Sequence, residues 1–169
     1  AQDDPVGIFM LKNGGVFTTT SDILSDNVQY KATPVGGDAT KVTFAPANTA
    51  ETIYYPQSGN VDFVAYYPYG LTGTNAGQVT TDYKYKVSVA TQSTATDQAK
   101  TDVLYSNNVV NKARSKTDPA ALEFNHALAK LVVNIKAGDG MTGADFSGMS
   151  AALKGFPTTA DLALANGNT

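Results

Sequence analysis

The sequence predicts an all-β domain, either a β-sandwich or a β-barrel, built from many short antiparallel strands. Apolar and polar residues alternate along much of the chain, which places alternate side chains on opposite faces of a sheet. Clusters of Gly, Pro, Asn and Asp separate these stretches, as at residues 13–15, 33–38 and 57–60, and such clusters form turns. The 169 residues are about the length of one ordinary domain with a single core.

Short alternating segments are expected as strands from one end of the chain to the other. In chain order they lie at residues 6–10, 15–19, 28–32, 41–44, 52–55, 61–67, 83–89, 103–106, 130–136, 149–153 and 161–165. The clearest is 83–89, where tyrosine and valine share one face and lysine and serine share the other. That pattern is typical of a strand in an antiparallel sheet with one face buried.

The segment VDFVAYYPYG at residues 61–70 predicts a strand that ends at Pro68. Its alternation favours the face with Phe63 and Tyr67 as the core, while Tyr66 lies on the other face. Proline ends the pairing because it has no N–H to donate. Tyr66 and Tyr69 are the two rings expected to form an exposed aromatic surface. The chain has no tryptophan, so tyrosine and phenylalanine must supply the aromatic packing, which favours a structural role for most of these rings.

Residues 118–131 fit two different structures. Asp118 and Pro119 suit the start of a helix, and Phe124, Leu128 and Leu131 have helical spacing. Residues 122, 124 and 126 also alternate, however, and β-branched residues follow directly at 132–135. The residues alone leave helix and strand open for this segment.

Charge and composition exclude several classes of protein. The net charge is −3 and no basic run occurs, so a nucleic-acid partner is not expected. The absence of cysteine excludes disulfides and thiolate metal sites, and it fits a cytosolic or an exported protein equally well. No apolar run reaches the roughly 20 residues of a transmembrane helix. The first residues lack the basic-then-apolar order of a signal peptide, so in an exported protein the targeting segment would already be removed. At the other end, we expect the natural chain to continue beyond Thr169.

The sequence contains no catalytic motif, and we expect neither an enzyme, a metal site nor a cofactor. It has no nucleophile elbow, no phosphate-binding glycine loop and no paired-histidine zinc motif. His126 is the only histidine, and a single imidazole without a recognisable nucleophile does not make an active site. Asp97 and Asp102 are interpreted as loop and strand-start residues.

Several motifs, in their order along the chain, resemble the fimbrillin-like proteins of Bacteroides-type bacteria, the type V pilin or fimbrium subunits. They are IYYP at 53–56, VDFVAYYPY at 61–69, TDQ at 96–98, DVLY at 102–105 and LEFNHALAKLVVNI at 122–135. PVGIFML at 5–11 resembles the family's first strand, and residues 152–155 with 160–167 resemble a hairpin late in its N-terminal domain. The resemblance covers essentially the whole chain.

This resemblance implies a transthyretin-like antiparallel β-sandwich of the Greek-key type, with about seven or more strands and minor helical turns. Residues 1–169 would then be a single sandwich domain, the N-terminal half of a two-domain protein. The expected function is a structural subunit, or a tip or anchor component, of cell-surface fimbriae that support adhesion. The resemblance also implies export as a lipid-anchored precursor to the outer membrane, with other fimbrial subunits and host or bacterial surface ligands as partners.

In the family, a protease removes an N-terminal strand, and the exposed groove accepts an extended strand from the next subunit. Val6, Ile8 and Met10 alternate along the first expected strand and would be the groove-filling side chains of the removable segment. The best-known members are cut after an arginine, but the only arginine here is Arg114, so Lys12 is the expected cleavage position.

The resemblance favours the strand interpretation of the segment that the residues left open, with one strand at 122–126 and a second from about Lys130. A second function from a different class is a surface carbohydrate-binding module, in which Tyr66, Tyr67 and Tyr69 would form a stacking platform.

Overall fold

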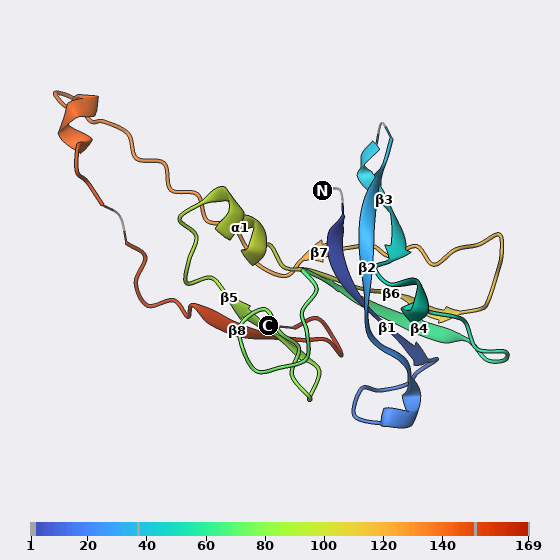
Figure 1. The fold of residues 1–169 in the computed structure, drawn as a ribbon. Coiled ribbons are helices and arrows are strands. Elements are labelled where there is room, and N and C mark those ends of the chain that lie inside the picture. Colours follow the sequence, from blue (N-terminus) through green and yellow to red (C-terminus); the bar gives the residue numbers. More distant parts are fainter. Residues whose placement is uncertain (1–2, 37, 151, 169) are drawn as a thin grey trace.

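Two antiparallel sheets form the protein in the computed structural model, which describes residues 3–36, 38–150 and 152–168. The larger sheet has six strands in the order β3-β2-β1-β4-β6-β7 (Figure 1). These are β1 (Asp4–Lys12), β2 (Ile23–Val35), β3 (Asp38–Pro46), β4 (Val61–Tyr67), β6 (Leu104–Lys112) and β7 (Asn125–His126). The smaller sheet pairs β5 (Lys84–Ser88) with β8 (Thr159–Ala163).

The helical elements are all short. The α-helix α1 spans Ala95–Thr101, and the 3-10 turns are η1 (Thr20–Asp22), η2 (Thr49–Glu51) and η3 (Gly143–Phe146). No helix in the described part of the chain is long and apolar enough to cross a membrane.

The main core lies between the two sheets. Phe9, Leu11 and Tyr66 project from the larger sheet, while Tyr85 and Leu162 project from the smaller one, and all five are buried in one cluster. Packing of one sheet face on another makes the fold a β-sandwich rather than a barrel. The all-β sandwich expected from the sequence is confirmed.

A second core covers the opposite face of the larger sheet. Val6, Ile8 and Met10 of β1 lie there beside Phe63 and Ala65 of β4. Loops close this side, and their partly buried side chains include Ile53, Tyr55, Ala120, Leu122 and Phe124. The central strands are therefore buried on both faces, which is unusual for an antiparallel sheet, where one face commonly meets water.

Seven of the expected strands lie within or overlap observed strands, and residues 61–67 match β4 at both ends. Residues 15–19 and 52–55 form turns and irregular chain instead, so these two predictions are wrong. The segment 118–131 is not helical. The strand expected at 122–126 is limited to β7, which pairs with only Leu104 and Tyr105 of β6.

The strands expected at 130–136 and 149–153 do not form in the described residues, and residue 151 lies outside them. In Figure 1 the chain between β7 and β8 leaves both sheets, carries η3 at its far end and returns to β8. Leu131, Val132, Val133 and Ile135 are consequently exposed. A strand needs a hydrogen-bonded neighbour, and this segment lies against none, so its β-branched residues alone do not produce one.

Asp97, interpreted from the sequence as a loop residue, instead lies in the first turn of α1, and that interpretation is wrong, whereas Asp102 lies in the short link between α1 and β6. The Thr94 hydroxyl accepts a hydrogen bond from the Asp97 N–H (3.1 Å), and the Asp97 carboxylate accepts one from the Thr94 N–H (3.2 Å). This reciprocal pair is a capping box, which satisfies N–H groups that the first turn of a helix leaves free.

Candidate functional site

The strand β1 lies at the centre of the larger sheet and not at its edge. It pairs antiparallel with β2 on one side and with β4 on the other. β2 in turn pairs with β3, and β4 pairs with β6. Removing β1 would therefore divide the sheet in two and leave a slot with unpaired N–H and C=O groups along both walls.

Val6, Ile8 and Met10, predicted as the groove-filling side chains, share one face of β1 and are buried in the second core. Their partners include Phe63 of β4 and Val109 of β6. The structure thus places the three residues together on one face, as their alternation indicates.

The other face of β1 also carries buried side chains, which were not among the predicted groove-filling residues. Phe9 is 0% exposed, and its ring lies 5.1 Å from that of Phe17 in an edge-to-face arrangement. Leu11 is buried in the same core. The continuous apolar run VGIFML at 6–11 was the available signal, because such runs are typical of strands covered on both faces.

Tyr66 is fully buried, with 0% exposure, so the expectation that its ring forms an exposed surface is wrong. It faces the main core because the smaller sheet covers that side of β4. The ring lies 6.1 Å from Phe9 and 5.1 Å from Tyr85 between centroids. Burial raises the pKa of the Tyr66 hydroxyl above its ordinary range.

Hydrogen bonds fix the Tyr66 hydroxyl at the end of β4. It donates to Asn27 Oδ1 (2.7 Å) and accepts from the Gly70 N–H (3.1 Å). The Asn27 side-chain amide donates to the Gly70 carbonyl (2.8 Å). Tyr66 thereby joins β2, β4 and the loop after β4.

The rings of Tyr66, Tyr67 and Tyr69 do not share one flat exposed face. Tyr67 is partly buried in the second core, on the opposite face of β4 from Tyr66. Tyr69 is also partly buried, and its N–H donates to the Pro5 carbonyl (2.9 Å). It lines a hollow of about 410 Å³ between α1, β5 and the loop after β4. The stacking platform of the carbohydrate-binding alternative is therefore not formed.

Lys12 is the last residue of β1 and stands at an exposed turn that leads into β2 (Figure 1). Its side chain is 53% exposed and its Nζ lies 3.9 Å from Asp22 Oδ1. The Gly15 N–H donates to the Lys12 carbonyl (2.8 Å), and Gly14 has a φ of +71°, which closes the turn. Residues 12–14 are exposed, while the peptide bond after Lys12 is hydrogen-bonded on both sides, because the Asn13 N–H also donates to the Asn60 carbonyl (3.1 Å).

His126 and Asp102 are brought together, with His126 Nδ1 2.6 Å from Asp102 Oδ1. Their side chains are 67% and 51% exposed, and neither lines the two hollows found around β5. An exposed pair without a nucleophile or an enclosing cleft does not make a catalytic constellation. In the described part of the chain, no group of three or more His, Asp or Glu side chains is placed to hold a metal ion.

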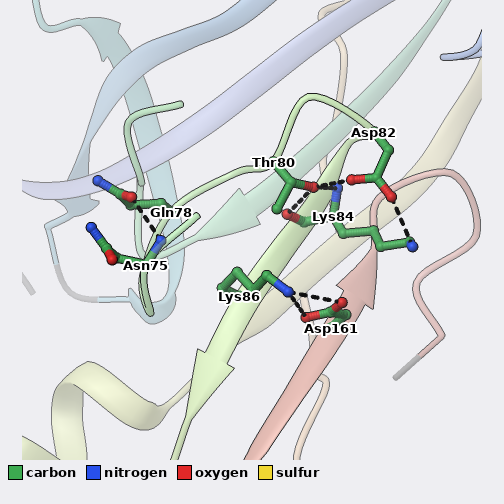
Figure 2. A network of polar contacts seen from close by, with 7 residues as sticks. All are labelled: Asn75, Gln78, Thr80, Asp82, Lys84, Lys86 and Asp161. Carbon is green, nitrogen blue, oxygen red and sulfur yellow. Dashed lines mark hydrogen bonds and ion pairs between the residues drawn. The ribbon is translucent and has the colours of Figure 1, made fainter. Parts of the chain in front are cut away.

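A polar network covers the face of the smaller sheet that points away from the core (Figure 2). Lys86 Nζ lies 2.9 Å from Asp161 Oδ1, which joins β5 to β8. Asp82 accepts from the Lys84 ammonium (2.8 Å) and from the Thr80 hydroxyl. The hydrogen bonds from Lys84 and then Thr80 lower the pKa of Asp82 to about 2. These contacts lie around the β5 side of the sandwich, away from the β1 slot.

A family model described as fimbrillin-like matches residues 1–169. The chain belongs to the fimbrillin-like family. The resemblance inferred from the ordered motifs is thereby confirmed. In this fimbrillin-like chain, β1 is a central strand of the larger sheet of an all-β sandwich.

Two proteins of Bacteroides uniformis are similar to this fimbrillin-like chain. A candidate fimbrium subunit, Fim1C, is 36% identical over 160 residues, which is 93% of this chain and 46% of Fim1C. The crystal structure of a candidate cell adhesion protein matches with a TM-score of 0.53 and 31% identity, and covers 75% of this chain and 42% of that protein. The fimbrillin-like chain thus spans about half the length of these relatives.

Proposed function

We propose that this chain is a domain of a cell-surface fimbrial subunit, that it supports adhesion, and that subunits join by adding a strand in the place of β1. The observation that carries the proposal is the position of β1, which is paired along both edges, buried on both faces and followed by the exposed Lys12. Membership of the fimbrillin-like family and similarity to a candidate fimbrium subunit support the same function.

The chemistry of such a slot favours a strand as its occupant. Loss of β1 would leave the inner edges of β2 and β4 without hydrogen-bond partners and would open both cores to water. An incoming apolar strand satisfies the backbone groups and refills the cores in one step. When the strand comes from another subunit, each contact is head to tail and does not close on itself, so the product is a filament.

The position of Lys12 supports a cut between β1 and β2. A protease needs an accessible and locally deformable segment, and such segments concentrate at exposed turns. Residues 13–19 form turns and irregular chain after β1, and the Lys12 side chain is more than half exposed. A cut there would leave β1 held only by its strand pairing and its buried side chains.

The proposed domain arrangement, export and partners are those that the family resemblance implies. Residues 1–169 would be the N-terminal of two sandwich domains, in a protein exported as a lipid-anchored precursor and displayed at the outer membrane. Its partners would be other fimbrial subunits, together with host or bacterial surface ligands. No enzymatic role is proposed, because His126 and Asp102 form an exposed pair without a nucleophile.

The test is to delete the full-length gene in its native host and to image surface filaments by electron microscopy, with an epitope-labelled copy restored in parallel. Loss or shortening of filaments, with label along the shaft, supports a stalk subunit. Label confined to the tip or base supports an accessory component. Unchanged filaments that carry no label anywhere would rule the fimbrial function out.

A further inference from the structure

Gly7 of β1 lies directly against the ring of Tyr66 and leaves no room for a side chain. The two residues are cross-strand partners in the β1–β4 ladder. A Cβ atom added to Gly7 would lie 2.2 Å from Tyr66 Cε1 and 2.5 Å from Cζ. Gly7 is not among the residues with positive φ, so the backbone itself would accept any amino acid. Steric exclusion by Tyr66 is therefore the reason that this position needs glycine.

The Tyr66 ring has no free space to move into. It is fully buried, with Phe9 and Tyr85 as ring neighbours on the core side. Its hydroxyl is tied to Asn27 Oδ1 and to the Gly70 N–H. Displacing the ring would break these bonds and disturb the packing between the sheets, and forced overpacking of a dense core is costly.

We propose that the slot left by β1 accepts only a strand that carries glycine at the position opposite Tyr66. The inference rests on the strand addition proposed above and deepens it by naming the chemistry of the partner. The partner segment is an extended strand of another fimbrial subunit, with glycine at this point and large apolar residues on both faces around it. An alternating strand without that glycine is excluded.

The same contact fixes the register of the incoming strand. In the direction of β1, the residues after the glycine take the places of Ile8 in the second core and Phe9 in the main core. A slip by one residue would place a side chain against Tyr66 and would exchange the two faces of the strand. The glycine therefore determines how far along the slot a strand can sit.

The proposal predicts an effect opposite to intrinsic strand preference. In a strand interior, alanine is ordinarily favoured over glycine by about two- to fivefold in the folding equilibrium. Overpacking against Tyr66 instead predicts that alanine at position 7 weakens binding by roughly tenfold or more. The sign of the change separates the two effects.

The experiment uses the folded full-length protein with a specific protease site inserted between Gly14 and Gly15. The protein is cut at that site after folding, so that β1 stays in place without a covalent link to β2. A fluorescent peptide with the sequence of residues 1–14 is exchanged into the cut protein and displaced by unlabelled competitors. The competitors are the wild-type peptide, the Gly7→Ala peptide and, as a control of similar size on the opposite face, the Ile8→Val peptide.

Competition by Gly7→Ala that is roughly tenfold or more weaker than wild type, with Ile8→Val much closer to wild type, supports the proposal. Equal competition by wild type and Gly7→Ala overturns the glycine requirement and leaves strand addition intact. If no peptide enters the slot even after partial denaturation and refolding, strand addition fails, and the glycine requirement fails with it.

A second measurement tests the steric basis in the uncut chain. Gly7→Ala is expected to lower the urea midpoint of unfolding, and the same substitution is expected to cost less in a Tyr66→Leu background, where the ring is absent. An unchanged or raised midpoint for Gly7→Ala in the wild-type background overturns the steric exclusion by Tyr66.

Discussion

The hydroxyl of Tyr66 is the point where three separate parts of the chain meet. Asn27 in β2 has a φ of +47°, and its side chain reaches both the Tyr66 hydroxyl and the Gly70 carbonyl. A buried hydroxyl with this many partners stabilises the fold mainly because its loss leaves other groups unpaired. Tyr66 therefore contributes both packing and a fixed connection between β2 and β4.

Replacing Tyr66 by phenylalanine tests that connection. The ring would still fill the core, but Asn27 Oδ1 and the Gly70 N–H would lose a partner. We expect the free energy of unfolding to fall by about 1–3 kcal/mol, measured by urea denaturation. Tyr69→Phe is the control, because its ring is only partly buried, and it should change stability by less than about 0.5 kcal/mol. Equal effects of the two substitutions would contradict this role.

Asp82 gives a prediction for pH. Hydrogen bonds from Lys84 and Thr80 stabilise its ionised form and lower its pKa from 3.8 to about 2. A carboxyl with a lowered pKa in the folded state stabilises the fold at pH above about 4, and this contribution is lost as the pH falls toward 2. An NMR titration of the Asp82 carboxyl should show the low pKa, and Lys84→Gln should move it back toward 3.8. A pKa that Lys84→Gln leaves unchanged would show that the ion pair does not form.

The sequence could predict some residues of the slot and not others. Val6, Ile8 and Met10 were predictable because alternation alone places them on one face. The continuous apolar run at 6–11 could have indicated Phe9, but the burial of Tyr66 was not predictable, because alternation cannot show whether the second face of a strand is covered. That depends on the smaller sheet, whose strands β5 and β8 are separated by 70 residues of chain, from Val89 to Thr158. The close approach of Gly7 to Tyr66 is likewise visible only once β1 and β4 are aligned.

At the scale of elements, β1 joins both cores, because its side chains enter them alternately. Phe9→Ala would leave a cavity in the main core, since the ring is fully buried against Phe17 and Tyr66. We expect a loss of about 3–5 kcal/mol in the free energy of unfolding, measured by chemical denaturation. The control is Val110→Ala in β6, where the side chain is exposed and the expected change is less than about 0.5 kcal/mol.

A small effect of Phe9→Ala, comparable with that of Val110→Ala, would show that β1 contributes little to the main core. It would also weaken the slot proposal, which requires both faces of β1 to be filled by large side chains. Both substitutions shorten a side chain within a strand, so their difference reports the burial of Phe9 together with the larger size of its ring.

Elements with a local signal were the predictable ones. Residues 61–67 form β4 because a run of residues that favour strands ends at Pro68, and proline cannot donate a hydrogen bond to continue the pairing. The capping pair Thr94 and Asp97 was a local signal for α1 that the sequence interpretation did not use. Residues 130–136 have the composition of a strand, but pairing is a tertiary property that no local pattern contains.

At the scale of the whole molecule, the proposal requires that β1 can be separated from the rest of the chain after folding. Lys12→Gln should block that separation, because it removes the expected cleavage position while leaving the turn intact. In the native host we expect the mature subunit to keep β1 and to be absent from filaments, checked by mass spectrometry of its N-terminus and by electron microscopy.

Lys116→Gln is the matched control, because Lys116 is also exposed but lies in the loop after β6. It should be processed and assembled as in the wild type. Normal processing of the Lys12→Gln subunit would show that the cut lies elsewhere, and assembly of a subunit that retains β1 would contradict strand replacement at this site.

The central position of β1 also determines how the molecule would respond to mechanical load. Hydrogen bonds in antiparallel ladders lie perpendicular to the strands. A pull along the axis of a strand in this slot therefore loads the bonds to β2 and β4 together, whereas an edge strand pulled in the same direction is held by one ladder only. Rupture under force is governed by the rate of the unfolding step. A strand held in this slot would consequently resist tension along its own axis through two ladders of hydrogen bonds.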